Sequence, residues 1–242
     1  MKDSIRLDKF LATAGYGSRK EIKKLTRDGN VSVNGKPVRD SSIHVSQANN
    51  LVTVNGVNVI YREFVYLMLN KPGGYISATE DTRDATVLEL VPAKYSHYEL
   101  FPVGRLDKDT EGFLLLTNDG KLAHELLAPK KHVPKTYLAE VAGQVTETHQ
   151  EAFSKGVILD DGYKTKPAEL KILSAGNTSK IELVIHEGKY HQVKRMFAAF
   201  DLKVVCLKRI AMGGLPLDEA LELGEIRELT DGELDLLKNG EL

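Results

Sequence analysis

The chain has 242 residues, of which 42% are hydrophobic and 28% charged, so it can bury the core of one large domain or of two smaller ones. Its formal net charge is −1, and the whole-chain balance therefore favours neither a cationic nor an anionic partner. Cys206 is the single cysteine, which excludes an internal disulfide framework and any multi-cysteine metal site.

Charge is unevenly distributed along the chain. Residues 1–60 carry ten Lys or Arg and five Asp or Glu, a balance of +5, whereas the remainder carries −6. This asymmetry indicates a small basic module that binds a polyanion, attached to a more acidic body. The sequence shows neither a leader pattern nor an apolar run of membrane-spanning length, so we expect a cytoplasmic, monomeric protein with no membrane partner.

The basic module is predicted to begin with two helices. Apolar residues recur at helical spacing over 7–14, and Gly15 ends that helix. Ser18 then has the position of an N-cap, and Glu21, three residues later, completes a capping box for the second helix.

Basic residues cover the second helix outside its apolar face. They are Arg19, Lys20, Lys23, Lys24 and Arg27. A solvated surface is the ordinary interpretation of such a helix. Here Asp28, four positions after Lys24, is the one acidic residue with that spacing, so most of these charges are not neutralised along the helix, and the helix N-terminus adds its own donors for phosphate.

A short strand over 31–33 and two Asn-Gly turns, at 34–35 and 55–56, complete the module. The pattern over residues 3–48 resembles the S-four-type RNA-binding domain, a small α+β unit. The resemblance implies that the basic second helix lies on structured RNA, with Arg19, Lys20, Lys23 and Lys24 as RNA contacts.

The body is predicted to mix strands and short helices without a repeat. Strands are expected over 64–69, 100–106, 113–117, 135–141, 168–173, 180–185 and 203–208, and helices over 121–127, 148–155 and 192–200. This order predicts an α+β fold with a mostly antiparallel sheet. We therefore divide the chain into an RNA-binding domain with its linker, 1–60, and a larger second domain, 61–242.

The stretch GRLDKDTEGFLLLTNDG, residues 104–120, places acidic groups beside an apolar strand. A hydrophilic turn is the ordinary interpretation. An acid–base pair of Asp107 with Asp109 or Glu111, as in a glycoside hydrolase, is disfavoured on the expectation that carboxylates at i and i+2 of an extended strand point to opposite faces. The third interpretation makes Asp107 a single nucleophilic carboxylate held ionised by a cation.

Four motifs favour the third interpretation. They are the stretch above, LNKPGGYIS (69–77), KTYLAEV (135–141) and HEGKYHQVKRMFAAF (186–200). In this order they resemble the RsuA group of ribosomal RNA pseudouridine synthases, which includes the RluB, RluE and RluF enzymes. The resemblance implies that Asp107 assists cleavage of the glycosidic bond, that Tyr137 stacks on the flipped uracil, and that Lys194 pairs with Asp107. Attack at C1′, attack on the base and removal of a ribose proton all stay open for the aspartate.

Lys194 and Arg195 are adjacent on the predicted last helix, so only one of them can face Asp107. We assign Arg195 to phosphate contact or structure, and the resemblance makes Arg105 an RNA contact that fills the space left by the flipped base. No cofactor or metal is expected, because no His, Cys and carboxylate set has ligand spacing.

The segment GKYHQVKRM, residues 188–196, resembles the version found in small-subunit enzymes, with Tyr190-His191 where large-subunit relatives tend to carry Asn-Arg. We therefore expect a uridine of 16S ribosomal RNA as substrate. A 23S ribosomal RNA synthase and a non-catalytic RNA-binding assembly factor are the alternatives.

Overall fold

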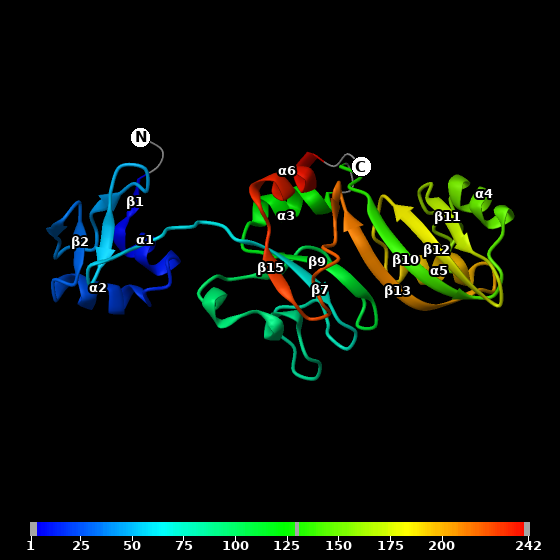
Figure 1. Ribbon diagram of the computed structural model, residues 1–242, viewed down its shortest axis with the longest axis horizontal. Helices are drawn as coiled ribbons and strands as arrows, with labels where there is room; N and C mark the ends of the chain where they lie inside the picture. The colour runs from blue at the N-terminus through cyan, green and yellow to red at the C-terminus, as the bar shows by residue number, and fades with distance from the viewer. Residues whose placement is uncertain (1–3, 129–130, 240–242) are drawn as a thin grey trace. The chain divides into compact units, whose positions relative to one another are not determined.

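The computed structural model describes residues 4–128 and 131–239, and the chain divides into two compact units (Figure 1). One unit runs up to Val65 and also contains Pro92–Glu99; the other comprises Tyr66–Val91 and the chain from Leu100 onward. The inclusion of Pro92–Glu99 in the first unit was not expected from the sequence. The functional boundary between residues 60 and 61 stays a prediction.

The N-terminal unit contains the two predicted helices. Helix α1 (Leu7–Thr13) is followed by α2 (Arg19–Arg27), which begins at its N-cap Ser18. The backbone N–H of Ser18 donates to the Glu21 carboxylate at 2.8 Å, and the Glu21 N–H donates to Ser18 Oγ at 3.4 Å. The predicted capping box is therefore confirmed.

Two small antiparallel sheets complete this unit. Strands β1 (Ile5–Arg6) and β4 (His44–Val45) form one, and the other has the order β3 (Lys36–Pro37), β2 (Val31–Val33), β5 (Val52–Val54), β6 (Val57–Asn58). Both Asn-Gly pairs have positive φ, as tight hairpin turns require. The apolar residues buried between helices and sheets are Leu7, Phe10, Leu11, Ile22, Val31, Val45, Val52, Val54 and Tyr61. This unit thus has a core of its own.

One nine-stranded sheet organises the C-terminal unit. Its main order is β11 (Glu169–Ser174), β12 (Thr178–Ile185), β10 (Lys135–Ala142), β13 (Lys203–Met212), β9 (Glu111–Thr117), β7 (Tyr66–Lys71) and β15 (Ile226–Glu228). Strand β8 (Phe101–Pro102) pairs with β9, and β14 (Leu215–Pro216) pairs with β13. The β13–β9 pair is parallel, whereas the other strand pairs of this sheet are antiparallel. The α+β class with a mostly antiparallel sheet is therefore confirmed.

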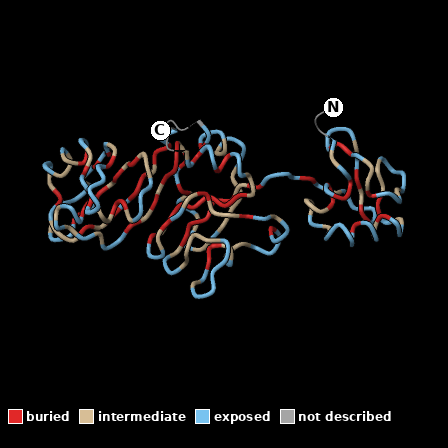
Figure 2. The backbone as a smooth tube through the Cα atoms, turned by 180° about the vertical axis from the view of Figure 1, so that it is seen from behind, coloured by how far each residue is buried: buried red, intermediate tan, exposed pale blue. Residues whose placement is uncertain are grey.

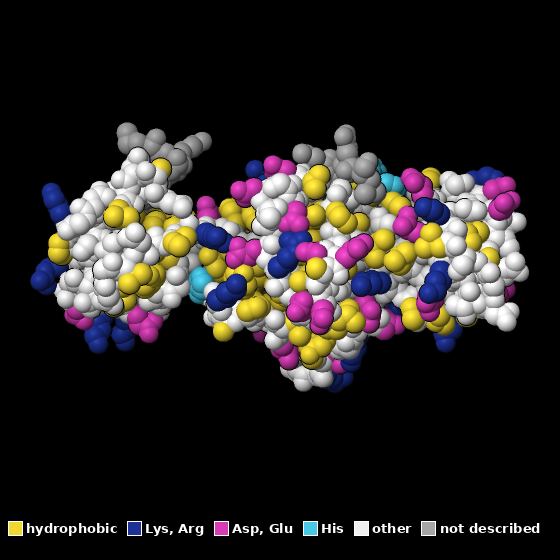
Figure 3. Space-filling view, viewed as in Figure 1, with side chains coloured by type: hydrophobic (Ala, Val, Ile, Leu, Met, Phe, Trp, Pro, Cys, Tyr) yellow, Lys and Arg dark blue, Asp and Glu magenta, His cyan; other side chains and the backbone are white. Residues whose placement is uncertain are grey.

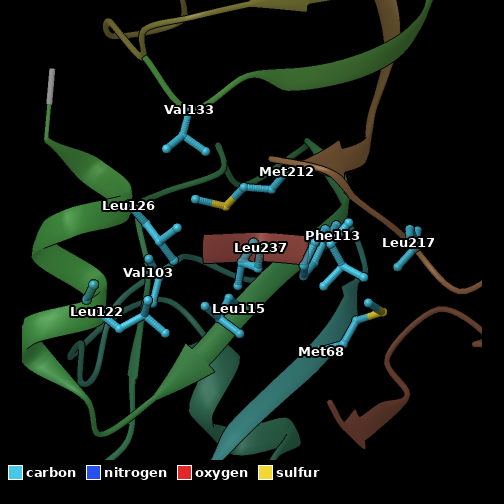
Figure 4. Packing of buried hydrophobic residues seen from close by; sticks show 12 residues of the cluster. Met68, Val103, Phe113, Leu115, Leu122, Leu126, Val133, Met212, Leu217 and Leu237 are labelled. Carbon is cyan, nitrogen blue, oxygen red and sulfur yellow. The ribbon is translucent and has the colours of Figure 1, made fainter. Parts of the chain in front are cut away.

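Helices cover this sheet in two places. Helices α3 (Gly120–Leu127) and α6 (Asp231–Asn239) lie near β7 and β9, whereas α4 (Glu147–Lys155) and α5 (Gln192–Ala198) lie near β11 and β13 (Figure 1). Under α3 and α6 the buried side chains of several strands meet, among them Met68, Phe113 and Leu115 (Figure 4). Buried segments lie inside each unit, whereas the outer loops are mostly exposed (Figure 2). Strands β14 and β15 and helix α6 were not expected from the sequence.

The strand predicted over 100–106 is wrong beyond its first residues. Strand β8 ends at Pro102, and the chain then forms a loop up to β9. Gly104 has a φ of +78°, which directs the backbone out of the extended conformation. Asp107 therefore lies on a loop. Among residues 4–128 and 131–239, no helix has the length and apolar character needed to cross a bilayer.

Candidate active site

Lys71, the last residue of β7, holds the loop between β8 and β9 through hydrogen bonds. This side chain is fully buried, and its ammonium donates to the carbonyl oxygens of Pro72 at 3.0 Å, Asp107 at 3.1 Å, Lys108 at 3.3 Å and Thr110 at 2.8 Å. Burial lowers the pKa of Lys71 to about 8. The ammonium thus fixes the backbone that carries Asp107.

Sequence reasoning missed this role of Lys71, because it interpreted residues 71–74 only as a turn. The available signal was a lysine at the end of a buried apolar strand, directly before Pro-Gly-Gly. A cation in that position must find acceptors in the interior, since an unpaired buried charge is costly.

Lys194 of α5 lies between two carboxylates of the loop. Its Nζ is 3.2 Å from Asp107 Oδ2 and 2.6 Å from Asp109 Oδ1. Burial acts to lower the pKa of Lys194, but the hydrogen bonds to Asp109 and Asp107 outweigh it and raise that pKa. The hydrogen bond from Lys194 in turn lowers the pKa of Asp109. About a quarter of the Asp107 and Lys194 side chains is exposed, so solvent screens this pair only in part.

The geometric argument against pairing Asp107 with Asp109 was wrong. Residues i and i+2 of an extended strand point to the same face, and this segment is a loop, from which both carboxylates reach one ammonium. Asp109 is nevertheless the outer of the two, with 73% of its side chain exposed against 28% for Asp107. Asp107 is therefore the carboxylate that faces the interior of the site.

His191 is a second cationic neighbour of Asp107 when it is protonated. Its Nε2 lies 3.6 Å from Asp107 Oδ1, and its ring stacks on that of Tyr190 with centroids 3.8 Å apart. The residue is the N-cap of α5 and has a left-handed φ of 47°, a conformation uncommon for a residue with a side chain. A contact between His191 and the aspartate was not expected from the sequence.

Tyr137 reaches the same place from the middle of the sheet. It lies on β10 between Leu183 of β12 and Arg209 of β13, and is 7% exposed. With Asp107 it lines a pocket of about 80 Å³, which we call the catalytic pocket. Its other lining residues are Arg105, Leu106, Thr110, Ile185, Gly188, Lys189, His191, Gln192, Val193 and Leu207. The fold thus brings Asp107, Tyr137 and Arg105 to one cavity, and Lys194 to its aspartate.

Arg195 lies apart from Asp107. Its guanidinium pairs with Asp160 and, at 2.7 Å, with Asp161, and these hydrogen bonds raise the pKa of Arg195. These contacts are consistent with a structural role, one of the two roles assigned to Arg195. Its role as a phosphate contact stays a prediction.

The basic residues of α2 lie on the N-terminal unit. Arg19, Lys20, Lys23 and Lys24 are exposed, whereas Ile22 and Thr26 face the core. Lys and Arg side chains project from the edges of this unit (Figure 3). The four residues form a charged surface that is accessible to a polyanion.

The catalytic pocket therefore combines one half-buried carboxylate and an aromatic ring, and Lys194 beside the pocket balances the charge of that carboxylate. Such a set can deliver a nucleophile or a base to a planar ligand stacked on the ring. In the part of the chain that the structure describes, no three His, Cys, Asp or Glu side chains are grouped as metal ligands would be.

Comparison with known proteins gives two family matches. The RNA pseudouridylate synthase family matches residues 65–199, and the S4 domain matches residues 5–52. The uncharacterized RNA pseudouridine synthase YtzG of Bacillus subtilis is 55% identical over 235 residues, which cover 96% of this chain and 98% of that protein.

Two relatives with named ribosomal subunits are equally similar. The ribosomal small subunit pseudouridine synthase A of Haemophilus influenzae is 40% identical, and the match covers 96% of this chain and 99% of that protein. The ribosomal large subunit pseudouridine synthase B of Bacillus subtilis is also 40% identical, over 96% and 95%. A crystal structure of a pseudouridylate synthase superposes with a TM-score of 0.68, at 39% identity, over 96% of this chain and 99% of that one.

Proposed function

Because the chain belongs to the RNA pseudouridylate synthase family, we propose that it isomerises a specific uridine of 16S ribosomal RNA to pseudouridine, with Asp107 as the catalytic carboxylate. The observation that carries the assignment of Asp107 is its contact with Lys194 in a pocket shared with Tyr137. Lys194 Nζ lies 3.2 Å from Asp107 Oδ2, so it offsets the negative charge of this half-buried carboxylate.

The reaction breaks the N1–C1′ bond of uridine, turns the base and joins C5 to C1′. The proton on C5 must leave and N1 must gain one, so no atom is lost overall. Asp107 starts the sequence as an anion, whether it attacks C1′, attacks the base or removes a ribose proton. Lys194 offsets its charge before the reaction, and Lys71 keeps its backbone in place.

Tyr137 has two roles in this proposal. Its ring supplies a stacking surface for the uracil, and its hydroxyl relays the C5 proton: the oxygen takes that proton while its own O–H proton passes to water. A pocket of about 80 Å³ cannot admit a base that is still paired in a duplex, so the uridine must be flipped out of its stack. Arg105, exposed at the rim, occupies the vacated space in the RNA.

Overall identity favours neither ribosomal subunit, since small- and large-subunit relatives both share 40% of their residues with this chain. The support for 16S ribosomal RNA is the pair Tyr190-His191. These residues stack on each other, and His191 lines the catalytic pocket beside Asp107, which supports a contact between this pair and the strand that carries the target. A ribosomal RNA substrate also implies action in the cytoplasm, and one chain supplies every residue of the site, as a monomer requires.

The test compares ribosomal RNA from cells with and without the gene, after treatment with a reagent selective for pseudouridine, by mass spectrometry of 16S and 23S fragments. We expect one 16S fragment to lose its label in the deletion strain and to regain it with the wild-type gene. Asp107→Asn, which keeps the shape and removes the charge, is expected to fail in this complementation although it folds and binds RNA.

Asp109→Asn is the matched control, because it removes the other carboxylate bound by Lys194. We expect it to retain activity within tenfold of wild type. A label missing from a 23S fragment instead would assign the alternative substrate. Purified Asp107→Asn protein with activity within tenfold of wild type would contradict the assignment of the catalytic carboxylate, and an inactive wild-type protein with normal RNA affinity would favour the assembly factor.

A further inference from the structure

A second pocket adjoins the catalytic pocket and is not used by the mechanism above. It has a volume of about 240 Å³, and Gly188 and Lys189 line both cavities. Its polar wall carries Lys135, Lys166, Lys189 and His186, so we call it the lysine pocket. A group bound there would lie next to whatever occupies the catalytic pocket.

Positive charge exceeds negative charge in the lysine pocket. Among the described residues that line it, Glu187 has the one carboxylate, against three lysines. That carboxylate already accepts from the hydroxyl of Tyr163 at 2.8 Å, from the backbone N–H of Lys166 at 2.9 Å and from the side-chain amide of Gln192 at 2.9 Å. It is therefore committed to neutral donors, and its single charge leaves the pocket with a net positive charge.

Lys135, on β10, is a partly buried cation of the lysine pocket. Its Nζ donates to the carbonyl oxygen of Val133 at 2.8 Å. Burial, followed by the charges of Arg209 and Lys166, lowers the pKa of Lys135 to about 8. Arg209 is itself 2% exposed, and one of its terminal nitrogens has no hydrogen-bond partner in the described structure. Cations gathered in this way are stabilised when an anion enters.

The remaining walls suit the flat face of a base. Leu126 and Val133 are buried apolar residues of the pocket, and the ring of Tyr163 forms another part of its lining. Lys189 Nζ lies 4.4 Å from the centroid of that ring, which holds this ammonium beside the aromatic wall. Aromatic and apolar walls beside a cationic one are what a nucleotide of an RNA strand requires.

We propose that the lysine pocket binds the nucleotide next to the target uridine, with Lys135, Lys166 and Lys189 holding the phosphodiester that joins the two. The proposal rests on the proposed function, since it places the target uridine in the catalytic pocket. It adds a substrate-binding site that extends RNA recognition on the catalytic unit beyond the flipped base.

The first test measures binding without catalysis. A fluorescent oligouridylate is titrated over a range of salt with wild type, with Lys189→Gln and with the triple variant Lys135→Met, Lys166→Gln, Lys189→Gln. We expect affinity to fall about tenfold or more in the triple variant, and the slope of log affinity against log salt to fall by about 0.7 for each phosphate that is no longer neutralised. The matched control is Lys155→Gln, an exposed lysine of α4, which should change neither quantity.

The single variant Lys189→Gln keeps the first test informative if the triple variant misfolds, because Lys189 is exposed whereas Lys135 is partly buried.

The second test uses RNA that contains the target uridine, with a neutral methylphosphonate in place of the phosphate on its 5′ or its 3′ side. For wild type, one of the two methylphosphonate RNAs should have a KM about tenfold higher than the unmodified RNA, with kcat within twofold. For Lys189→Gln, the same methylphosphonate should cause no further increase in KM.

Unchanged oligouridylate affinity and salt slope in a folded triple variant would overturn the proposal, as would equal KM penalties of the methylphosphonate in wild type and Lys189→Gln. Failure of the proposed function is a different result: the wild-type protein would modify no ribosomal RNA, while the binding titration would still report on the pocket.

Discussion

Replacing Lys20, Lys23 and Lys24 together by glutamine is expected to weaken RNA binding and to flatten its salt dependence. All three side chains are exposed on α2, and the helix keeps its capping box and its buried Ile22 in the variant. Surface substitutions of this kind change stability by about 0.5 kcal/mol or less each, so the N-terminal unit should stay folded.

The magnitude follows from the release of counterions. Each phosphate that a lysine neutralises contributes about 0.9 to the slope of log affinity against log salt for double strands and about 0.7 for single strands. Removing the three ammonium groups should therefore reduce the slope by about 2 to 3. Between about 50 and about 200 mM salt, wild-type affinity should fall roughly 20- to 40-fold more than that of the variant.

The assay is fluorescence anisotropy of a labelled 16S ribosomal RNA fragment at a series of salt concentrations. The control variant replaces Lys155, Lys171 and Lys203, three exposed lysines of the C-terminal unit, and so removes the same charge elsewhere. A slope equal to that of wild type in the α2 variant, or an equal reduction in both variants, would show that the basic residues of α2 only interact with solvent.

Three further outcomes are expected. Tyr137→Phe should bind RNA normally but release much less tritium from uridine labelled at C5; full release would leave Tyr137 only its stacking role. Lys71→Met should lower the free energy of unfolding by about 2–3 kcal/mol, measured by urea titration, and should also lower kcat, because the carbonyl oxygens of the Asp107 loop lose their shared donor. Unchanged stability would mean that the conformation of this loop does not depend on the Lys71 ammonium. The hydrogen bond from Arg227 lowers the pKa of Glu233 to about 2, below its value in the unfolded chain, so this carboxylate stabilises the fold above about pH 5 and loses that contribution as the pH falls toward 2. The contribution of Glu233 to the free energy of unfolding at neutral pH is at most about 3 kcal/mol. Glu233→Gln should therefore reduce the loss of stability as the pH is lowered, and an unchanged loss of stability would contradict this role of Glu233.

Local patterns in the sequence were sufficient for much of the fold. The capping box of Ser18 and Glu21 depends on contacts three residues apart, and the helix begins where it predicts. Strand β10 was predicted within one residue, because a run rich in β-branched, aromatic and aliphatic residues favours an extended chain. The order of four motifs indicated the RNA pseudouridylate synthase family, which the family match over residues 65–199 confirms.

Only the tertiary structure decided how the site is assembled. Lys71 and Lys194 are far from Asp107 in the chain, and their contacts arise because β7 and β9 pair while α5 packs near β13. The same packing determines that residues 103–110 form a loop, on which Asp107 and Asp109 face one ammonium. The periodicity of hydrophobic residues depends on positions a few residues apart in the sequence. The acceptors of a buried cation are instead the groups that the fold brings within about 3 Å of it, which can be distant in the sequence. The sequence by itself therefore determined the elements, the family and the candidate residues, and the packing of distant strands decided which charges meet.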